Sequence, residues 1–250
     1  MKISIVTITL NSELTLEDTI KSVIEQNVDG IELEYLIIDG GSTDRTLEII
    51  KKYNERITMW ISEPDNGISD AFNKGIALSS GDIIGIISSD DLLYENALQR
   101  VRYSFDMCTD VYYGKGLLLH KNGKLTERRV SSNLEMLKKS MSICHSSVFV
   151  NKAAYKKHGM FDISLSCVMD RDLLLLMYSG GALFKFIDHP LSIVRVGGIS
   201  FVQYFKKVQP EEERISVKYG MNPVYARCRT YGNWAYMHLL LFVRKVTGKV

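Results

Sequence analysis

Residues 81–91 read GDIIGIISSDD, a short apolar run that ends in two serines and two aspartates. The run 83–87 carries no polar side chain, which is typical of a strand buried on both faces of a sheet. Similar runs lie at 3–9, 33–38 and 57–61, and segments with helical spacing separate them at 15–27, 43–53 and 68–78. This alternation predicts an α/β protein with a mostly parallel sheet that is covered by helices on both faces.

Polar clusters follow three of these runs, at 11–12, 39–42 and 88–91. In open α/β sheets, ligands bind beyond the carboxyl ends of the strands. Because all three clusters stand at such ends, we expect one ligand site along this edge of the sheet.

The second half of the chain is less regular. A turn at 121–124, KNGK, separates two strand-like segments, 111–119 and 125–130, and so predicts a hairpin. Helices are expected at 152–158 and 170–179, and strands at 183–187 and 191–196. Beyond Phe201 the pattern becomes helical and basic. We therefore expect a catalytic domain over 1–203, with halves at about 1–110 and 111–203, and a helical tail over 204–250.

Composition narrows the class of protein. A chain of 250 residues with 46% hydrophobic content can bury one substantial core. Four scattered cysteines without CxxC spacing argue against a zinc site or a disulfide framework and favour a reducing compartment. No run has the length of a spanning helix, and the first apolar run is too short for a secretory signal.

The tail carries an uneven charge. Residues 206–250 hold nine Lys and Arg against three Glu. Aromatic residues beside this charge suit a helix on an anionic membrane surface, and a helix packed on the catalytic domain explains them equally well. Nucleic acid is not an expected partner, because the basic residues are confined to the tail and no recognition motif is present.

Two acidic motifs at strand ends admit two interpretations each. Asp90 and Asp91 are adjacent carboxylates that either bind a hard divalent cation such as Mg²⁺ or Mn²⁺, or begin an exposed acidic helix. Asp39, in DGGSTD at 39–44, either contacts a nucleotide or belongs to a tight turn in which Ser42 or Thr43 caps the next helix.

Two further motifs surround helix starts. Asp65 and Lys74 lie in EPDNGISDAFNKG, 63–75, where a helix N-terminus and a lysine favour an anion or simply form a capped surface helix. Asp170 and Asp172 stand two residues apart on a helix and therefore point in different directions. One of them can act as a general base in a cleft, while the other caps the helix or pairs with Arg171.

Taken together, these motifs resemble the inverting glycosyltransferases of family 2, which have the GT-A fold. The resemblance extends over about residues 3–200, and five segments carry it: SIVTITLN (4–11), IDGGSTDRT (38–46), SEPDNGISDAFNKG (62–75), GDIIGIISSDD (81–91) and DRDL (170–173). Each segment is weak evidence alone, whereas their order and spacing are specific.

The resemblance implies roles on the donor side. It places Thr9, Asn11, Asp39, Asp65, Lys74 and Asp90 at the nucleotide sugar. Within this set Asp39 contacts the base, Asp65 the nucleoside, and Asp90 lies near the ribose and the metal. Asp91 is the principal metal ligand, and the first position of the motif is Ser89, which lacks a carboxylate.

On the acceptor side the resemblance assigns the catalytic base to Asp170. Met169 stands where relatives often have Glu, so Asp172 remains the alternative base. His145 is either a contact to the acceptor or the diphosphate, or a structural histidine. Arg195 and the segment 197–200 are expected near the diphosphate.

The resemblance also implies the reaction. A sugar passes from a UDP-hexose or UDP-N-acetylhexosamine to a saccharide acceptor, with Mn²⁺ or Mg²⁺ and with inversion to a β-glycoside. The expected setting is bacterial surface polysaccharide synthesis (lipopolysaccharide, O-antigen or exopolysaccharide) on polyprenyl-diphosphate-linked acceptors. The expected location is the cytoplasm or the cytoplasmic face of the inner membrane. The alternatives are a nucleotidyltransferase-like enzyme and a non-catalytic sugar-nucleotide-binding protein.

Overall fold

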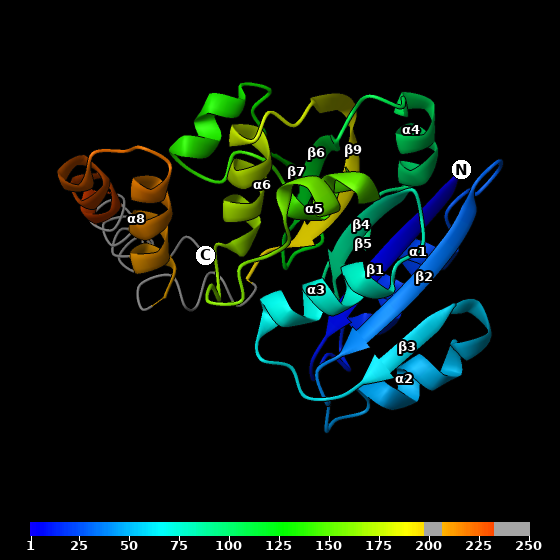
Figure 1. Ribbon diagram of the computed structural model, residues 1–250. Helices are drawn as coiled ribbons and strands as arrows, with labels where there is room; N and C mark the ends of the chain where they lie inside the picture. The colour runs from blue at the N-terminus through cyan, green and yellow to red at the C-terminus, as the bar shows by residue number, and fades with distance from the viewer. Residues whose placement is uncertain (198–206, 233–250) are drawn as a thin grey trace.

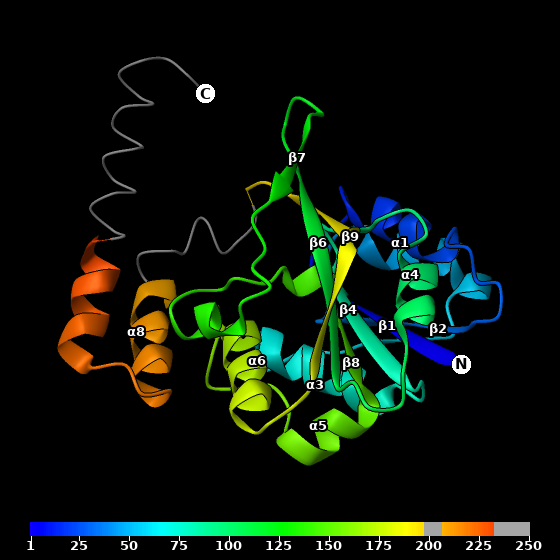
Figure 2. The same ribbon diagram turned by 90° about the horizontal axis from the view of Figure 1, so that it is seen from above.

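A computed structural model describes residues 1–197 and 207–232, and Figures 1 and 2 show it in two orthogonal views. The strands are β1 (Lys2–Thr9), β2 (Glu32–Asp39), β3 (Met59–Ser62), β4 (Ile83–Ser88), β5 (Leu92–Leu93), β6 (Val111–Leu119), β7 (Leu125–Arg128), β8 (Val148–Asn151) and β9 (Phe184–Arg195). The α-helices are α1 (Leu16–Ile24), α2 (Thr46–Lys52), α3 (Ile68–Leu78), α4 (Ala97–Ser104), α5 (Lys152–His158), α6 (Met169–Ser179) and α8 (Gln209–Lys218). Short 3₁₀ helices are η1 (Asn54–Arg56), η2 (Leu134–Lys138) and η3 (His145–Ser147).

All the strands join one sheet in the order β3-β2-β1-β4-β8-β6-β9-β5, with β7 paired to β6. The strands β3, β2, β1 and β4 run parallel, as the alternation of strands and helices predicts. From β4 to β8 and from β8 to β6 the pairing is antiparallel. The first half of the chain therefore builds a parallel Rossmann-like half-sheet, and the second half extends it as a mixed sheet.

Two apolar cores cover the two faces of the sheet, and alternation along the strands divides them. On β1, Val6 and Ile8 face the core under α3, α5 and α6, whereas Ile3 and Ile5 face the core under α1, α2 and α4. Successive side chains of a strand point to opposite faces, so the apolar residues of β1 supply both cores. This arrangement fixes the carboxyl ends of the parallel strands at one edge.

Helix α3 approaches the sheet closely at Gly75. A Cβ atom on this residue would lie 2.3 Å from Cγ1 of Val6, which is fully buried on β1. Only a residue without a side chain permits this spacing between helix and strand.

We expect Gly75→Ala to lower the free energy of unfolding by about 1–3 kcal/mol because of overpacking. Alanine normally favours a helix by ~1 kcal/mol over glycine, but here the clash with a stiff, β-branched valine dominates. Urea unfolding measures the difference. Gly232→Ala is the matched control, since no atom of the described residues lies within 4 Å of the position of its Cβ. Equal or greater stability of Gly75→Ala would contradict the packing argument.

Several predicted element boundaries are wrong, each for a local reason. Thr43 does not cap the helix predicted at 43–53, because α2 begins at Thr46, whose backbone N–H bonds the Asp44 carboxylate instead at 2.9 Å. The strands predicted at 183–187 and 191–196 form one strand, β9. A register shift opposite Lys115 accommodates Pro190, which has no N–H to donate to the ladder.

The sequence does not predict α4 in the first half, or β8, η2 and η3 in the second half. The predicted hairpin and the helices near 152–158 and 170–179 are present as β6–β7, α5 and α6. The predicted domain boundary at 203 and most of the loop 197–200 lie outside the described residues, as does the tail beyond 232.

The described part of the tail is helical. Helix α8 lies beside α6, and residues 223–232 form a further helix (Figures 1 and 2). Within residues 1–197 and 207–232, no helix has both the length and the apolar character needed to cross a membrane.

Candidate active site

The predicted site residues gather where the parallel strands end. Asn11 follows β1, Asp39 ends β2, and Asp90 and Asp91 follow β4. The turn η3 and the first residues of α6 border the same region, because Ser146 of η3 contacts Asp91, and His145 and Asp170 line one small cavity. Fold and register thus bring together residues from 9 to 195 in the sequence.

Asp91 is the buried carboxylate of the site, with 6% of its surface exposed. Its Oδ2 accepts a hydrogen bond from the Ser146 hydroxyl, and its Oδ1 accepts one from the Arg195 backbone N–H at 3.3 Å. Burial, and secondarily the negative charge of Asp90, raise the pKa of Asp91 to about 7. A carboxylate in this state gains from a cation that neutralises it.

The neighbours of Asp91 are held by hydrogen bonds. Ser89 shares a hydrogen bond of 2.7 Å with Ser12 through the two hydroxyls, so its oxygen is engaged within the chain. Asp90 is half-buried, and its backbone carbonyl accepts a hydrogen bond from the Arg195 guanidinium at 2.8 Å. The other end of that guanidinium pairs with Asp18 at 2.7 Å on the surface. An exposed pair of this kind is weak, so Arg195 can exchange Asp18 for a phosphate at little cost.

Asp39 is fully buried, and its carboxylate accepts four hydrogen bonds. They come from the N–H groups of Gly41 and Ser42 and from the hydroxyls of Ser42 and Ser62, at 2.5 to 3.2 Å. Through these four hydrogen bonds Asp39 stabilises the turn after β2. The predicted contact between Asp39 and a nucleotide base stays a prediction.

Asn11 and Thr9 border the same turn. Asn11 has a φ of 50°, a left-handed conformation that asparagine tolerates, and its Oδ1 accepts the Thr43 N–H at 2.8 Å. Thr9 is buried at the end of β1, and its hydroxyl has no hydrogen-bond partner within the described chain. Buried polar groups are normally paired, so the Thr9 hydroxyl is available to a ligand or to water.

Lys74 is held within an acidic cluster. Its ammonium lies 2.7 Å from Asp65, 2.9 Å from Glu63 and 3.5 Å from Asp70. The hydrogen bonds to Asp65 and then Glu63 raise the pKa of Lys74 above its ordinary value. Because its charge is matched by these acids, Lys74 positions Asp65 rather than offering a free cation.

The Asp65 carboxylate lies over Gly40. Its Oδ2 is 2.9 Å from the position that a Cβ at Gly40 would occupy, and the same position is 3.5 Å from Leu10. The glycine therefore allows a carboxylate and an exposed apolar side chain to meet beside the end of β2. This is a suitable surface for a nucleoside.

Asp170 and His145 both line a small cavity of about 10 Å³ that is otherwise lined mostly by apolar side chains. Burial lowers the pKa of His145, while the charge of Asp170 opposes that effect. The ring packs against Phe72 and Phe161, and its Nε2 is buried without a hydrogen-bond partner in the described chain. A neutral imidazole beside a carboxylate suits a hydroxyl better than a diphosphate.

Asp172, the alternative base, points away from this cavity. It is buried, and its two oxygens accept hydrogen bonds from the Lys218 ammonium at 2.7 and 3.0 Å. The Asp170 carboxylate, by contrast, accepts only the Arg171 N–H, at 2.7 Å, among the described residues. The expected divergence of the two side chains is therefore present, and Asp170 is the one that faces the cavity.

Two residues of the site are absent from the sequence predictions. The contact of Ser146 with Asp91 cannot be predicted from the sequence, because a serine after a histidine has no distinctive pattern. Arg128, at the end of β7, is half-buried and forms no ion pair within the described residues. Its positive charge lowers the pKa of both Asp91 and His145, although burial has the larger effect on each. A basic residue at the end of a predicted hairpin strand was the only available signal.

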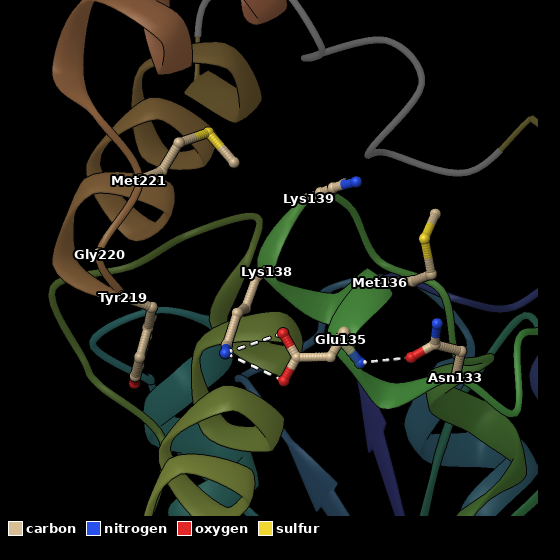
Figure 3. A pocket seen from close by; sticks show the side chains of 8 residues that line it. All are labelled: Asn133, Glu135, Met136, Lys138, Lys139, Tyr219, Gly220 and Met221. Carbon is tan, nitrogen blue, oxygen red and sulfur yellow. Dashed lines mark hydrogen bonds and ion pairs between the residues drawn. The ribbon is translucent and has the colours of Figure 1, made fainter.

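A groove of about 280 Å³ between η2 and the residues after α8 lies elsewhere (Figure 3). Figure 3 shows Lys138 pairing with Glu135 at its edge. Glu135 also accepts the hydroxyl of Tyr178, near the C-terminal end of α6, whereas Asp170 stands at the N-terminal end. None of the predicted site residues lines this groove, although two of its lining residues, Lys138 and Tyr219, bond Arg171 and Asp172 of α6.

The carboxylates of the site fit a metal ion that takes its remaining ligands from a substrate. Within residues 1–197 and 207–232, no group of three or more His, Cys, Asp or Glu side chains is arranged to hold an ion. Hard cations such as Mg²⁺ use one or two carboxylates together with phosphate oxygens. One buried carboxylate, Asp91, beside a second one is the arrangement that such shared coordination requires.

Comparison with known proteins adds to this geometry. Residues 4–175 match the sequence model described as glycosyl transferase family 2. A PGL/p-HBAD biosynthesis glycosyltransferase of Mycobacterium tuberculosis is 27% identical over 227 residues, which cover 86% of each chain.

Solved structures share the fold. S. aureus TarS 1–349 in complex with UDP-GlcNAc aligns with a TM-score of 0.70 at 17% identity, over 90% of this chain and 69% of that one. The mannosyltransferase PcManGT from Pyrobaculum calidifontis, in complex with GDP-Man and Mn²⁺, aligns with a TM-score of 0.62 at 14% identity, over 95% and 75%. The chain spans 41% of the longer TarS structure. These likenesses show the GT-A fold.

Proposed function

The chain belongs to glycosyl transferase family 2, and on that premise we propose that it transfers a sugar from a UDP-sugar to a saccharide acceptor with inversion. The observation that carries this proposal is the placement of Asp91 and Asp170. One is a buried carboxylate suited to a cation, and the other is a carboxylate that lines a cavity and has no side-chain hydrogen-bond partner among the described residues. A metal-assisted leaving group and a general base are the two requirements of a single displacement.

The donor is proposed to be a UDP-hexose or UDP-N-acetylhexosamine. The TarS relative in fold binds UDP-GlcNAc, and Asp65 with Leu10 offers a polar and an apolar surface beside the end of β2. The buried, unpaired hydroxyl of Thr9 at the end of β1 supplies a further hydrogen-bonding group.

The cation is proposed to be Mn²⁺ or Mg²⁺, held by Asp91 with Asp90 beside it. Support comes from the raised pKa of Asp91 and from the Mn²⁺ complex of PcManGT. When bound, the ion neutralises charge that develops on the nucleoside diphosphate as it leaves. Arg128 and Arg195 add positive charge on the same side.

In the proposed mechanism, Asp170 accepts the proton of the acceptor hydroxyl as its oxygen attacks the anomeric carbon. His145, kept neutral by burial, orients that hydroxyl through Nε2. The bond from the anomeric carbon to the diphosphate oxygen breaks as the new bond forms on the opposite face. One displacement inverts the configuration, so an α-linked donor gives a β-glycoside.

The test is a thermal-shift screen of UDP-, GDP- and dTDP-sugars with and without Mn²⁺, followed by acceptor assays with the donor that gives the largest shift. A UDP-sugar is expected to stabilise the protein only with the cation. Release of UDP supports the proposal, whereas release of pyrophosphate would favour a nucleotidyltransferase. Binding without any turnover would favour a non-catalytic sugar-nucleotide-binding protein.

The pKa of Asp91 predicts how cation binding depends on pH. Below pH 7 the carboxyl holds a proton that the cation must displace, so affinity for Mn²⁺ should rise about tenfold per pH unit up to pH 7 and then level off. Electron paramagnetic resonance of free Mn²⁺ measures this in the absence of nucleotide. Asp91→Asn serves as the control that loses the dependence. A flat affinity between pH 5.5 and 7 in the native protein would contradict the assignment.

The acceptor is proposed to be a lipid-linked saccharide, such as a polyprenyl-diphosphate-linked one in bacterial surface polysaccharide synthesis. The proposed location is accordingly the cytoplasm or the cytoplasmic face of the inner membrane, with the basic tail as the membrane contact. Removal of residues 233–250 should then abolish sedimentation with anionic vesicles. If the shortened protein is folded and still sediments with the vesicles, the proposed membrane contact of the tail is wrong.

A further inference from the structure

Helix α8 packs beside α6 (Figures 1 and 2). The polar contacts of α8 with α6 concentrate at the start of α6. The start of α6 carries Asp170, but its own capping residue, Val168, has no side chain that can accept a hydrogen bond. The first N–H groups of a helix lack partners within the helix and need acceptors from elsewhere.

Glu211 of α8 supplies acceptors to the N-cap residue of α6, Val168, and to the two residues before it. Its carboxylate accepts the backbone N–H groups of Ser166, Cys167 and Val168 at 2.9, 2.9 and 3.2 Å, and the Ser166 hydroxyl at 2.8 Å. Although burial opposes the effect, these hydrogen bonds lower the pKa of Glu211 below its ordinary value. Glu211 is therefore ionised at neutral pH and caps the base-bearing helix from 43 to 45 residues away in sequence.

Arg171, the residue after Asp170, forms the second connection. It is fully buried, and its guanidinium bonds the carbonyls of Leu137 and Lys138, both at 2.8 Å, and the Glu212 carboxylate at 2.6 Å. It thereby ties α6 to η2 and to α8 at once. A buried cation with three fixed acceptors has little freedom to rotate.

Asp172 forms the third connection, through its ion pair with Lys218 near the end of α8. The hydroxyl of Tyr219 adds a hydrogen bond of 3.1 Å to the Asp172 carbonyl. Every residue on either side of Asp170, from 166 to 172 apart from Met169, is thus bonded to α8 or η2, while the Asp170 carboxylate has only one backbone donor.

We propose that α8 is a positioning element of the active site, in which Glu211 caps the helix of the catalytic base and fixes where the Asp170 carboxylate points. Residues 209–218 are then part of the catalytic unit, not of an appended tail. This inference rests on the proposed role of Asp170 as the base. A base must lie within hydrogen-bond reach of its proton, so a shift of about 1 Å in its helix costs a large part of the rate.

The test compares Glu211→Ala with Glu211→Gln and with Glu213→Ala. Glu213 is the matched control, because it stands on the same helix and pairs instead with Arg227, at 3.2 Å. The assay is UDP release from UDP-N-acetylglucosamine with Mn²⁺, or from whichever nucleotide sugar the donor screen selects. Rates are normalised to the concentration of protein that binds donor, so that loss of folded protein does not count.

Glu211→Ala is expected to lower kcat by roughly 10–100-fold while the donor Kd stays within twofold. Glu211→Gln, which keeps one acceptor oxygen, should recover most of that loss, and Glu213→Ala should match the native enzyme. A purely structural role would lower the folded fraction and leave kcat of the folded protein unchanged. That result, or equal kcat for Glu211→Ala and Glu213→Ala, would overturn the inference.

Failure of this inference is distinguishable from failure of the proposed function. If Asp170→Asn keeps its activity, the assignment of Asp170 as the base is wrong, and the proposed role of α8 is then wrong as well. If Asp170→Asn is inactive while Glu211→Ala turns over at the native rate, the base assignment stands and only the positioning role is lost.

Discussion

Asp170→Asn is expected to lower kcat for sugar transfer by about 10²–10⁴-fold, the range that general-base catalysis contributes. The amide has nearly the same shape as the carboxylate but cannot take a proton from the acceptor hydroxyl. Since the donor surfaces lie at the ends of β1, β2 and β4, the donor Kd should stay within twofold. Initial-rate kinetics and calorimetric titration of donor with Mn²⁺ measure the two quantities separately.

Asp172→Asn is the matched control for this prediction. It makes the same chemical change two residues further along α6, where the side chain pairs with Lys218 instead of facing the cavity. We expect a loss of stability of about 1 kcal/mol, because Lys218 is partly exposed and can regain water, and a kcat within about fivefold of the native value. If instead Asp172→Asn is the inactive variant and Asp170→Asn is active, the two carboxylates must exchange roles.

Asp91→Asn is expected to act in opposite directions on stability and on activity. Activity should fall by about 100-fold or more, because a neutral amide is a poor ligand for a hard cation and the leaving diphosphate loses its counter-charge. The cation-dependent part of donor binding should disappear in the same variant. Thermal-shift titrations with donor, in the presence and absence of Mn²⁺, measure that loss.

Stability should rise in the same variant above pH 7. The folded pKa of Asp91 is about 7, well above that of an unfolded aspartate, so the folded protein binds the extra proton between about pH 4 and 7. The native protein therefore loses stability as the pH rises through this window, and the asparagine variant does not. Relative to the native protein, the free energy of unfolding of the variant should be higher by roughly 1–3 kcal/mol at pH 8 and unchanged at pH 4.

Ser146→Ala is the control for that stability effect. It removes a hydrogen bond to the ionised Asp91 and should therefore destabilise the protein most at high pH, the reverse of Asp91→Asn. Urea unfolding at pH 4, 6 and 8 distinguishes the two. An Asp91→Asn variant that is less stable than the native protein at pH 8 would contradict the unfavourable burial of this carboxylate.

The parallel half of the fold was predictable because its signals are local. Strands such as β1 and β4 are buried at nearly every position, and segments with clear helical spacing follow β1, β2 and β3. The polar clusters at their ends marked the edge of the sheet where the site lies. Short or irregular elements such as η3 and β8 have too few residues to show a period.

The details of the site depended on contacts that are distant in sequence. The choice between Asp170 and Asp172 could not be made from DRD alone, because Lys218, 46 residues later, is what engages Asp172. The acidic surroundings of Lys74 could not be predicted either, because the fold is what places Glu63 and Asp65 around its ammonium. Thr43 does not cap the next helix as predicted, because the hydrogen bonds of a turn are set by its folded geometry.

The turn η3 has a thermodynamic consequence for the two substrates. One of its residues, Ser146, bonds Asp91, the proposed cation ligand, and the residue before it, His145, lines the same cavity as Asp170, the proposed base. If the binding of one substrate shifts this turn, the contact that the turn makes at the site of the other substrate also moves. Linkage then requires reciprocity: if bound donor strengthens acceptor binding by some factor, bound acceptor strengthens donor binding by the same factor.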